Sequence, residues 1–233
     1  MLIFALDSTA VVGSVALCRD GKPLASFTVK NGNTHSETLL PMAKALFDVT
    51  GVTPDDVDLF ACSEGPGSFT GVRIGAATIK GLTFGKNKTV IGVSALEAMA
   101  RNLLPAKGLI CPVMNARRGQ VYNALFRAEG TQLVRLCEDR ALAAAELKNE
   151  LEAMGEPFYL VGDGVEVTEA VLGGLTPSPV SAQIAEQNAL GVAACALKAY
   201  EDGVRGTDAE LAPTYLRLPQ AERERLEKEK RKV

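Results

Sequence analysis

The run SEGPGSFTGVRIGAATIKGL, residues 63–82, decides the fold that this sequence predicts. It follows the apolar residues 59–62, and the whole pattern is typical of a strand, a tight turn and a helix. Proline fixes φ and glycine reaches backbone conformations closed to other residues, so the GPG at 65–67 predicts the turn. The hydroxyl of Ser68 or Thr70 can then cap the helix, because it can accept a hydrogen bond from a free N–H of the first turn.

Small residues recur on one face of this predicted helix, at Gly71, Gly75 and Thr78. Glycine inside a helix costs roughly 0.5–1 kcal/mol relative to alanine, so two of them on one face indicate a close packing contact. The spacing alone favours a contact with the chain's own sheet. The same face could instead receive a helix of a partner protein, or the helix N-terminus could hold a phosphate.

Length and composition favour a two-lobed cytoplasmic protein. The 233 residues are 47% hydrophobic and 23% charged, enough for one large core or two smaller ones. No apolar run reaches about 18 residues and the first strand lacks a basic flank, so neither a membrane span nor a secretory signal is expected. The 5 cysteines are scattered without CxxC spacing, which indicates buried thiols in a cytosolic protein.

Charge argues against RNA binding by this chain alone. The net charge is −3, whereas a protein that grips RNA by itself usually has a basic face. Residues 217–233 are rich in both lysine or arginine and glutamate, a mixture more typical of a solvated helix than of a nucleic-acid patch.

The order of predicted elements repeats. The first half predicts strands at 2–6, 11–18 and 24–29, a helix from a capping box at 34–37 to about residue 51, a strand at 59–62, the helix after residue 68, a strand at 89–93 and a helix at 95–104. The second half predicts strands at 109–115, 120–128 and 132–136, a helix at 143–154, a strand at 157–161 and helices at 167–172 and 182–202. We therefore expect an N-terminal lobe at 1–106, a C-terminal lobe at 107–205 and a charged C-terminal segment at 206–233.

Two such halves resemble the two-lobed α/β fold of the actin-like ATPases, a duplicated ribonuclease H-like βββαβα arrangement. In that fold, Asp7, Ser8 and Thr9 would form the first phosphate-binding turn, where a carboxylate can hold magnesium through water. The same tripeptide is equally typical of a simple turn. The matching turn of the second half offers Asn115 in place of a carboxylate, and residues 162–164 (GDG) are at most a remnant of an adenosine-binding turn. The sequence predicts an incomplete ATP site.

His35 is the only histidine, which excludes a metal centre built from two or more histidines of this chain. Its place in the first helical turn, between Thr34 and Glu37 of the predicted capping box, has a structural explanation, so no catalytic residue and no metal site are predicted. Arg117 and Arg118 follow a predicted strand. They can be strand-end charges, or they can meet an acidic partner or a nucleotide phosphate.

Residues 65–75, GPGSFTGVRIG, resemble the signature segment of the TsaB (YeaZ) family. Less specific similarities to the same family occur at residues 7–9, 34–39, 117–122 and 212–217, so the resemblance spans nearly the whole chain. The family usually has Asp-Ala-Arg where this chain has Asn115-Ala116-Arg117, which leaves any role of that acid open.

The resemblance implies a non-catalytic scaffold or activator that pairs with TsaD, its catalytic relative. TsaD transfers a threonylcarbamoyl group from threonylcarbamoyl-AMP to N6 of adenosine 37 in tRNAs that read ANN codons, and it binds metal through two histidines on the helix equivalent to that of His35. TsaE, a small ATPase, joins the complex, and tRNA is expected to bind only through it. The resemblance also implies a homodimer when TsaD is absent, and ATP or ADP with magnesium at a subunit interface.

Two adjacent helices are expected to form the partner interface. The expected interface residues are Ser36, Leu39, Leu40, Ala43, Phe69, Gly71, Val72, Gly75 and Thr78, and the candidate nucleotide-binding residues are Asp7, Ser8, Thr9, Arg117 and Arg118. Two alternatives remain open. The chain could be a small-molecule kinase or ATP-binding protein using Asp7, or a protease, although the sequence offers neither a metal cluster nor a Ser/His/Asp set with a spare histidine.

Overall fold

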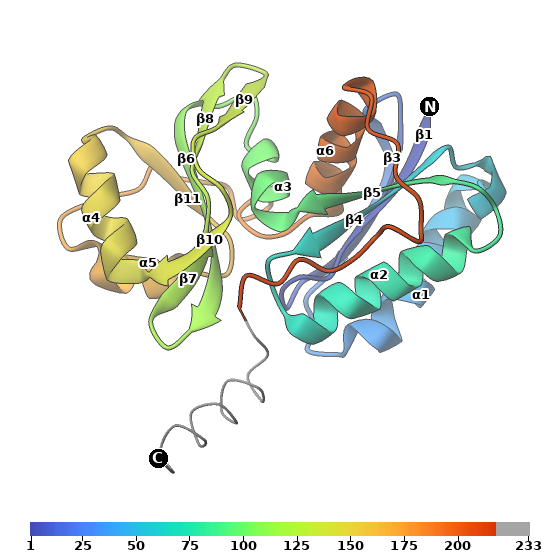
Figure 1. Ribbon diagram of the computed structural model, residues 1–233, viewed down its shortest axis with the longest axis horizontal. Helices are drawn as coiled ribbons and strands as arrows, with labels where there is room; N and C mark the ends of the chain where they lie inside the picture. Colours follow the sequence, from blue (N-terminus) through green and yellow to red (C-terminus); the bar gives the residue numbers. More distant parts are fainter. Residues whose placement is uncertain (218–233) are drawn as a thin grey trace, which may run out of the picture.

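A twisted five-stranded sheet forms the centre of the first lobe (Figure 1). The computed structural model describes residues 1–217. The strands are β1 (Leu2–Asp7), β2 (Gly13–Arg19), β3 (Lys22–Val29), β4 (Leu59–Gly65) and β5 (Thr89–Ser94), in the order β3-β2-β1-β4-β5. β1 to β3 are antiparallel neighbours, whereas β4 runs parallel to β1 and β5 parallel to β4. Every residue of β1 is buried, because helices cover both faces of the sheet.

The predicted order of helices in this lobe is confirmed. α1 (His35–Thr50) and α2 (Phe69–Thr83) cover one face of the sheet, and α3 (Ala95–Arg101) follows β5. α1 begins as its capping box predicts, with the Thr34 N–H donating to Glu37 Oε2 at 3.1 Å, and it ends at Gly51, whose φ of 66° suits glycine. Successive residues of β1 point to opposite faces of the sheet and so contribute to two separate hydrophobic cores. Phe4 and Leu6 pack toward α1 and α2, while Ile3 and Ala5 pack on the opposite side.

The final helix, α6 (Ala189–Glu201), corrects the predicted division into lobes. It was expected in the second lobe, within 107–205, but it packs against the first sheet together with Ile3, Ala5 and Ala16. Gly191 allows this contact, because a Cβ there would lie 2.2 Å from the carbonyl oxygen of Ala98 in α3. The helix begins at residue 189 rather than 182, because Asn188 Oδ1 accepts the N–H of Leu190 at 2.8 Å and caps it.

The second lobe contains β6 (Lys107–Arg117), β7 (Gln120–Asn123), β8 (Phe126–Glu129), β9 (Gln132–Arg135), β10 (Arg140–Ala143), α4 (Ala144–Met154), β11 (Phe158–Val161) and α5 (Val165–Leu172). β6 is central and pairs with β7, β8 and β11. The single strand predicted at 120–128 is two strands, divided at residues 124–125. β10 was not predicted, because its four residues are all half-buried and show no alternation of apolar and polar side chains.

Residues 206–217, here called the strap, return across the first lobe and reach the second (Figure 1). The Gly206 carbonyl accepts the N–H of Val90 at 3.0 Å, Leu211 is buried in the core beneath α1 and α2, and the Thr214 N–H donates to the Glu64 carbonyl at 2.7 Å. The guanidinium of Arg217 then donates to the carbonyl of Ala116 in β6 at 2.8 Å. The strap is the first part of the predicted charged segment 206–233, and residues 218–233 lie outside the described residues.

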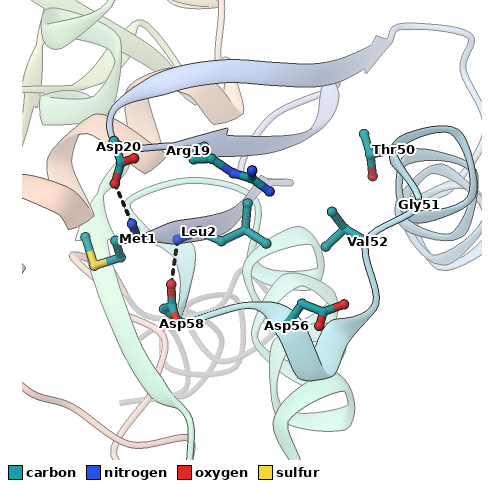
Figure 2. A pocket seen from close by; sticks show the side chains of 9 residues that line it. All are labelled: Met1, Leu2, Arg19, Asp20, Thr50, Gly51, Val52, Asp56 and Asp58. Carbon is teal, nitrogen blue, oxygen red and sulfur yellow. Dashed lines mark hydrogen bonds and ion pairs between the residues drawn. The ribbon is translucent and has the colours of Figure 1, made fainter.

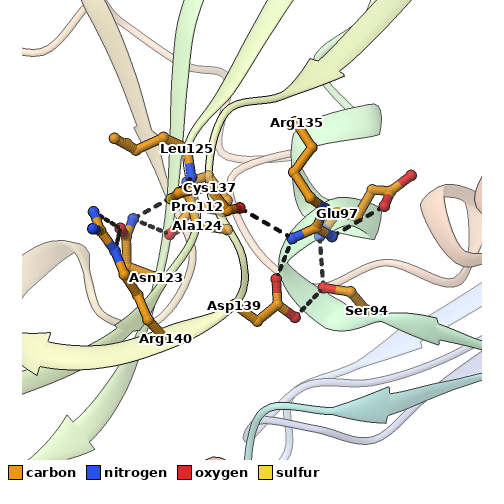
Figure 3. Close-up of polar contacts among 10 residues, drawn as sticks. All are labelled: Ser94, Glu97, Pro112, Asn123, Ala124, Leu125, Arg135, Cys137, Asp139 and Arg140. Carbon is orange, nitrogen blue, oxygen red and sulfur yellow. Dashed lines mark hydrogen bonds and ion pairs between the residues drawn. The ribbon is translucent and has the colours of Figure 1, made fainter.

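A polar network also joins α3 to the second lobe (Figure 3). The Ser94 hydroxyl donates to Asp139 Oδ2 at 2.6 Å, and Arg135 bridges Asp139 at 2.5 Å and Glu97 at 3.1 Å. The apolar side of α3 contributes to both cores, since Ala98 packs in the first lobe and Met99 against β6. The two lobes are therefore linked by ion pairs, by apolar packing and by the strap.

The small-residue face of α2 lies against the chain's own β1, which is the alternative that the spacing favoured. A Cβ at Gly71 would lie 2.0 Å from the Ser8 carbonyl oxygen, and one at Gly75 would lie 2.5 Å from Ser8 Oγ. The Gly71 contact is to backbone and cannot be relieved by a side-chain movement, whereas the Gly75 contacts are to the side chains of Ser8 and Leu6, which are themselves buried. The prediction that Gly71 and Gly75 contact a partner is therefore corrected, because this face is already occupied.

Two glycine substitutions in α2 test this packing. Gly71→Ala should destabilise the chain by about 3 kcal/mol or prevent folding, because α2 would have to move away from Ser8. Gly81→Ala, in the same helix, is the matched control: a Cβ there meets nothing within 4 Å, so it should be neutral or stabilise by up to about 1 kcal/mol. Urea unfolding measures both. Equal effects would contradict the packing assigned to Gly71.

Candidate functional site

The Asp7 turn (residues 7–9) is completely closed by the protein around it. Asp7, Ser8 and Thr9 are each at most 1% exposed. Asp7 Oδ1 accepts hydrogen bonds from the Thr9 N–H at 2.9 Å and the Thr9 hydroxyl at 2.7 Å, and Asp7 Oδ2 accepts from the Ser63 hydroxyl at 2.5 Å. The Ser8 hydroxyl donates to the Gly71 carbonyl at 2.9 Å. The polar side chains of the turn therefore bind the protein itself.

The segment at residues 65–71 forms the cover over this turn. The N–H of Ser68 donates to the Thr9 carbonyl at 2.7 Å, and a Cβ at Gly67 would lie 2.3 Å from that same oxygen. Because glycine has no side chain, the backbone of residues 65–71 can lie directly against the Asp7 turn. It occupies the place from which a phosphate would contact the turn. A magnesium-bound phosphate does not fit here, and the prediction that Asp7, Ser8 and Thr9 hold a nucleotide is corrected for this structure.

Burial raises the pKa of Asp7 above its ordinary value, and the hydrogen bonds from Ser63 and Thr9 lower it only in part. The carboxyl group is thus biased toward its neutral form, whereas a magnesium ligand has to be ionised. Burial also raises the pKa of Asp163, in the second lobe, with Gln187 donating to its Oδ1 at 3.3 Å.

The matching turns of the second lobe are shaped by the chain's own contacts. Asn115 Oδ1 accepts the N–H of Arg117 at 2.8 Å, which folds the hairpin between β6 and β7 and gives this amide a structural role. Arg117 and Arg118, with φ of 64° and 56°, form the tip of the hairpin. In the 162–164 turn, a Cβ at Gly162 would lie 2.1 Å from the Val113 carbonyl oxygen, so this turn is seated directly on β6.

His35 supports the loop between β1 and β2. Its Nε2–H donates to the Ala10 carbonyl at 2.7 Å, and a Cβ at Gly13 would lie 3.1 Å from the imidazole ring. The histidine thus links the start of α1 to the loop that follows the Asp7 turn, a contact that the sequence analysis did not predict. Within residues 1–217, no group of three or more His, Cys, Asp or Glu side chains is placed to hold a metal ion.

The remaining candidate is the solvent side of α1 and α2. Six of the nine predicted interface residues are buried within the chain and are not available to a partner: Leu39, Ala43, Gly71, Val72, Gly75 and Thr78. Ser36 and Leu40 are exposed and Phe69 is half-buried. The structure adds five exposed residues that the sequence analysis missed, and we define the outer face as these five together with Leu40: Leu40, Ala45, Val49, Ala77, Gly81 and Phe84.

The outer face carries exposed apolar side chains among charged ones. Leu40, Val49 and Phe84 are 54%, 70% and 81% exposed, small residues are exposed at 45, 77 and 81, and the exposed ion pair of Lys44 and Asp48 lies between Leu40 and Val49 on α1. Small residues let another helix approach closely, and exposed leucine, valine and phenylalanine supply apolar area to bury. The signal that could have identified this face is the second stripe of small residues at 77 and 81, on the side of α2 opposite Gly71 and Gly75.

A pocket at the far end of the first sheet is lined by three carboxylates that already have partners, Asp20, Asp56 and Asp58 (Figure 2). It has a volume of about 470 Å³ and lies around the N-terminus. The Met1 amino group pairs with Asp20, and the Leu2 N–H donates to Asp58 at 2.7 Å. Asp56 accepts the N–H of Thr53 at 2.8 Å. This pocket offers no group prepared for chemistry.

The raised pKa of Asp7 predicts a specific pH dependence. A carboxyl with a higher pKa in the folded chain than in the unfolded one binds its proton more tightly when folded, so the stability it contributes in acid is lost as pH rises. Asp7→Asn should therefore gain stability relative to the wild type as pH rises above the ordinary pKa of an aspartate, about 3.9, by about 1.4 kcal/mol for each pKa unit of difference. Urea unfolding across this range measures it, and parallel curves for the two proteins would contradict it.

Comparisons with known proteins agree with this arrangement. The family model for TsaD, tRNA N6-adenosine threonylcarbamoyltransferase, matches residues 30–222. The "tRNA threonylcarbamoyladenosine biosynthesis protein TsaB" of Bacillus subtilis is 28% identical over 99% of this chain and 100% of the relative. The protein of the same name in Escherichia coli is 32% identical, over 70% of this chain and 72% of the relative.

The solved structure of YeaZ from Pseudomonas aeruginosa superimposes with a TM-score of 0.80 at 26% identity, covering 92% of this chain and 99% of that one. The predicted fold class, a two-lobed α/β actin-like fold, is confirmed. In the part of the chain that the structure describes, no helix is both long and apolar enough to cross a bilayer. The chain belongs to the TsaB (YeaZ) family.

Proposed function

We propose that this chain acts in tRNA threonylcarbamoyladenosine biosynthesis as the non-catalytic subunit that pairs with a TsaD-type transferase. The observation that carries the proposal is the combination of a closed Asp7 turn with exposed apolar side chains, Leu40, Val49 and Phe84, on the solvent side of α1 and α2. The relatives' names support the pathway, and the geometry supports a non-catalytic role for this chain within it. TsaD would transfer the threonylcarbamoyl group to N6 of adenosine 37 in tRNAs that read ANN codons, and this chain would hold TsaD in its active arrangement.

The inner geometry supports a non-catalytic role. Both carboxylate oxygens of Asp7 already accept hydrogen bonds from Ser63 and Thr9, and the one histidine in the sequence, His35, is used to support a loop. A residue that acts as an acid, a base or a metal ligand must reach its substrate or ion. These candidate groups are directed at the chain's own backbone and hydroxyls instead.

The match to the TsaD family model supports pairing with a relative of this chain. A TsaD-type protein would carry helices equivalent to α1 and α2, so each partner would offer two helices to the other. Such a pair has approximate two-fold symmetry, in which the same patch is used on both sides. The same geometry allows this chain to form a homodimer when TsaD is absent, and TsaD should then compete with the homodimer.

The other components would act on the complex. A net charge of −3 favours tRNA binding by the assembled proteins over binding by this chain alone. TsaE would join the pair of subunits as its ATPase. ATP or ADP with magnesium would lie at a subunit interface, because the Asp7 turn is closed.

Reconstitution tests the proposal directly. TsaD, TsaE, a source of threonylcarbamoyl-AMP, ATP and tRNA are combined with and without this chain, and modified adenosine is measured by mass spectrometry. We expect modification only when the chain is present, and none from the chain alone. Equal modification without it would overturn the proposed function.

The outer face can be tested with one charge. Leu40→Glu should weaken association with TsaD at least 10-fold, because a carboxylate would be buried against an apolar helix pair. Leu24→Glu is the matched control, since Leu24 is 46% exposed on β3, on the side of the sheet away from α1. Isothermal titration measures both affinities. Equal weakening by the two variants would argue against the outer face as the TsaD contact.

The kinase alternative predicts nucleotide binding by the isolated chain. The closed Asp7 turn predicts no saturable heat when the chain alone is titrated with Mg-ATP. A saturable heat that Asp7→Asn abolishes would instead establish the alternative. Asp58→Asn serves as a control for a general charge effect, because Asp58 lies at the opposite end of the sheet beside the N-terminus.

A further inference from the structure

An aromatic and arginine cluster lies where the strap crosses the start of α2. The rings of Phe69 and Tyr215 stack with centroids 4.8 Å apart at an interplanar angle of 30°. Arg73 lies with its Cζ 3.9 Å from the Phe69 centroid and 5.8 Å from the Tyr215 centroid. Its Nε donates to the Tyr215 hydroxyl at 2.8 Å. Residues separated by about 140 positions therefore fix one guanidinium group.

The two terminal nitrogens of the Arg73 guanidinium remain accessible in this cluster. Arg73 is exposed, and within residues 1–217 it forms no ion pair. Its face is held by the Phe69 ring and its Nε edge by Tyr215, while the two terminal nitrogens remain for a ligand. A planar fork of N–H groups with a fixed orientation matches the two oxygens of a carboxylate. Because the orientation is already fixed, little side-chain entropy remains to be lost on binding.

We propose that Arg73 is a preorganised receptor for an aspartate or glutamate side chain of the protein that docks on the outer face. The inference rests on the proposed function and adds to it the chemistry of the partner at one point. Arg73 lies one turn before Ala77 and two turns before Gly81 on α2, so its fork continues the outer face. A partner helix that packs on Ala77 and Gly81 would carry its acidic residue to this end of α2.

The charges around the outer face favour an acidic protein partner. Lys44 pairs with Asp48 at 2.6 Å, and Glu37 is engaged by the cap of α1. Arg73 and Lys80 are thus the charges that the described part of α1 and α2 leaves without a carboxylate partner. Two cations beside exposed apolar side chains complement an acidic residue in a helix interface, whereas RNA would require a broad basic surface, which a net charge of −3 does not supply.

The strap positions the receptor. Thr214, next to Tyr215, is tied to Glu64 by its N–H at 2.7 Å and by its hydroxyl at 3.3 Å, and Leu211 is buried in the core. Tyr215 is therefore a positioning residue, because its hydroxyl orients Arg73 without itself contacting the partner carboxylate. This gives the strap a role in recognition in addition to its link between the lobes.

The experiment measures association of TsaD with this chain and its variants by isothermal titration at 50 and 300 mM salt. Arg73→Gln should weaken binding at least 10-fold and reduce its salt dependence, because the charged fork is lost. Arg73→Lys keeps the charge without the fork and should recover only part of the affinity. Tyr215→Phe keeps the stacking but removes the hydroxyl acceptor, and it should weaken binding by roughly 3-fold.

Arg205→Gln is the matched control. Arg205 also stacks on a tyrosine, Tyr200, with its Cζ 3.5 Å from the ring centroid, but it follows α6 rather than α2. Its loss should leave binding unchanged. Thermal unfolding of each variant identifies any that fail to fold. If an Arg73 variant does not fold, the binding of Tyr215→Phe, the mildest change, decides whether the cluster contributes to association.

The outcomes separate this inference from the proposed function. If the wild-type chain does not bind TsaD, or if Leu40→Glu binds as well as wild type, the proposed docking fails and the inference fails with it. If Leu40→Glu abolishes binding while Arg73→Gln has no effect, only the inference is overturned. Full affinity in Arg73→Lys would exclude the bidentate fork. Loss of tRNA binding in Arg73→Gln with unchanged TsaD binding would identify a phosphate ligand and overturn the carboxylate.

Discussion

The close approach of the glycine-rich segment to the Asp7 turn is the constraint on which the rest of the structure depends. Gly67, Gly71 and Gly75 bring α2 and the turn before it so near to Ser8 and Thr9 that a Cβ at any of the three would lie 2.5 Å or less from an atom of these two residues. This contact buries the polar turn and satisfies it internally. It also fixes α2 on the sheet, which directs the opposite side of the helix to solvent.

The links between the lobes are also made by the chain's own residues. Ser94 bonds to Asp139, Arg217 bonds to the Ala116 carbonyl, and Lys30 pairs with Glu186. Such contacts hold the lobes together through the chain's own side chains and backbone. A surface that is already fixed loses less conformational entropy when it is bound. A closed interior and a fixed outer face are therefore two consequences of one packing arrangement, and both suit a scaffold.

The sequence predicts what depends on local chemistry. The GPG turn, the cap at Thr34 and the order of elements in the first lobe follow from turn residues, capping residues and periodicity, and the structure confirms them. It does not predict that α6 returns to the first sheet, because an apolar stripe with one glycine, Gly191, could pack on either lobe. The split at residues 124–125 and the half-buried β10 lack any periodic signal. Tertiary contacts decide these features, and periodicity contains no information about them.

The absence of tertiary information in the sequence pattern also explains why most of the predicted interface residues are buried in the structure. Gly71 and Gly75 stand out in the sequence because glycine is unusual in a helix, yet what makes them necessary is the chain's own β1. Ala77, Gly81 and Phe84 lie on the other side of α2, where the second stripe of small residues is the available signal and an exposed phenylalanine cannot be distinguished from a buried one. Gly81 meets nothing within 4 Å in this chain, unlike Gly71 and Gly75. The conspicuous glycines therefore specify the fold, and the outer residues that this fold holds in place are the ones left exposed on α2.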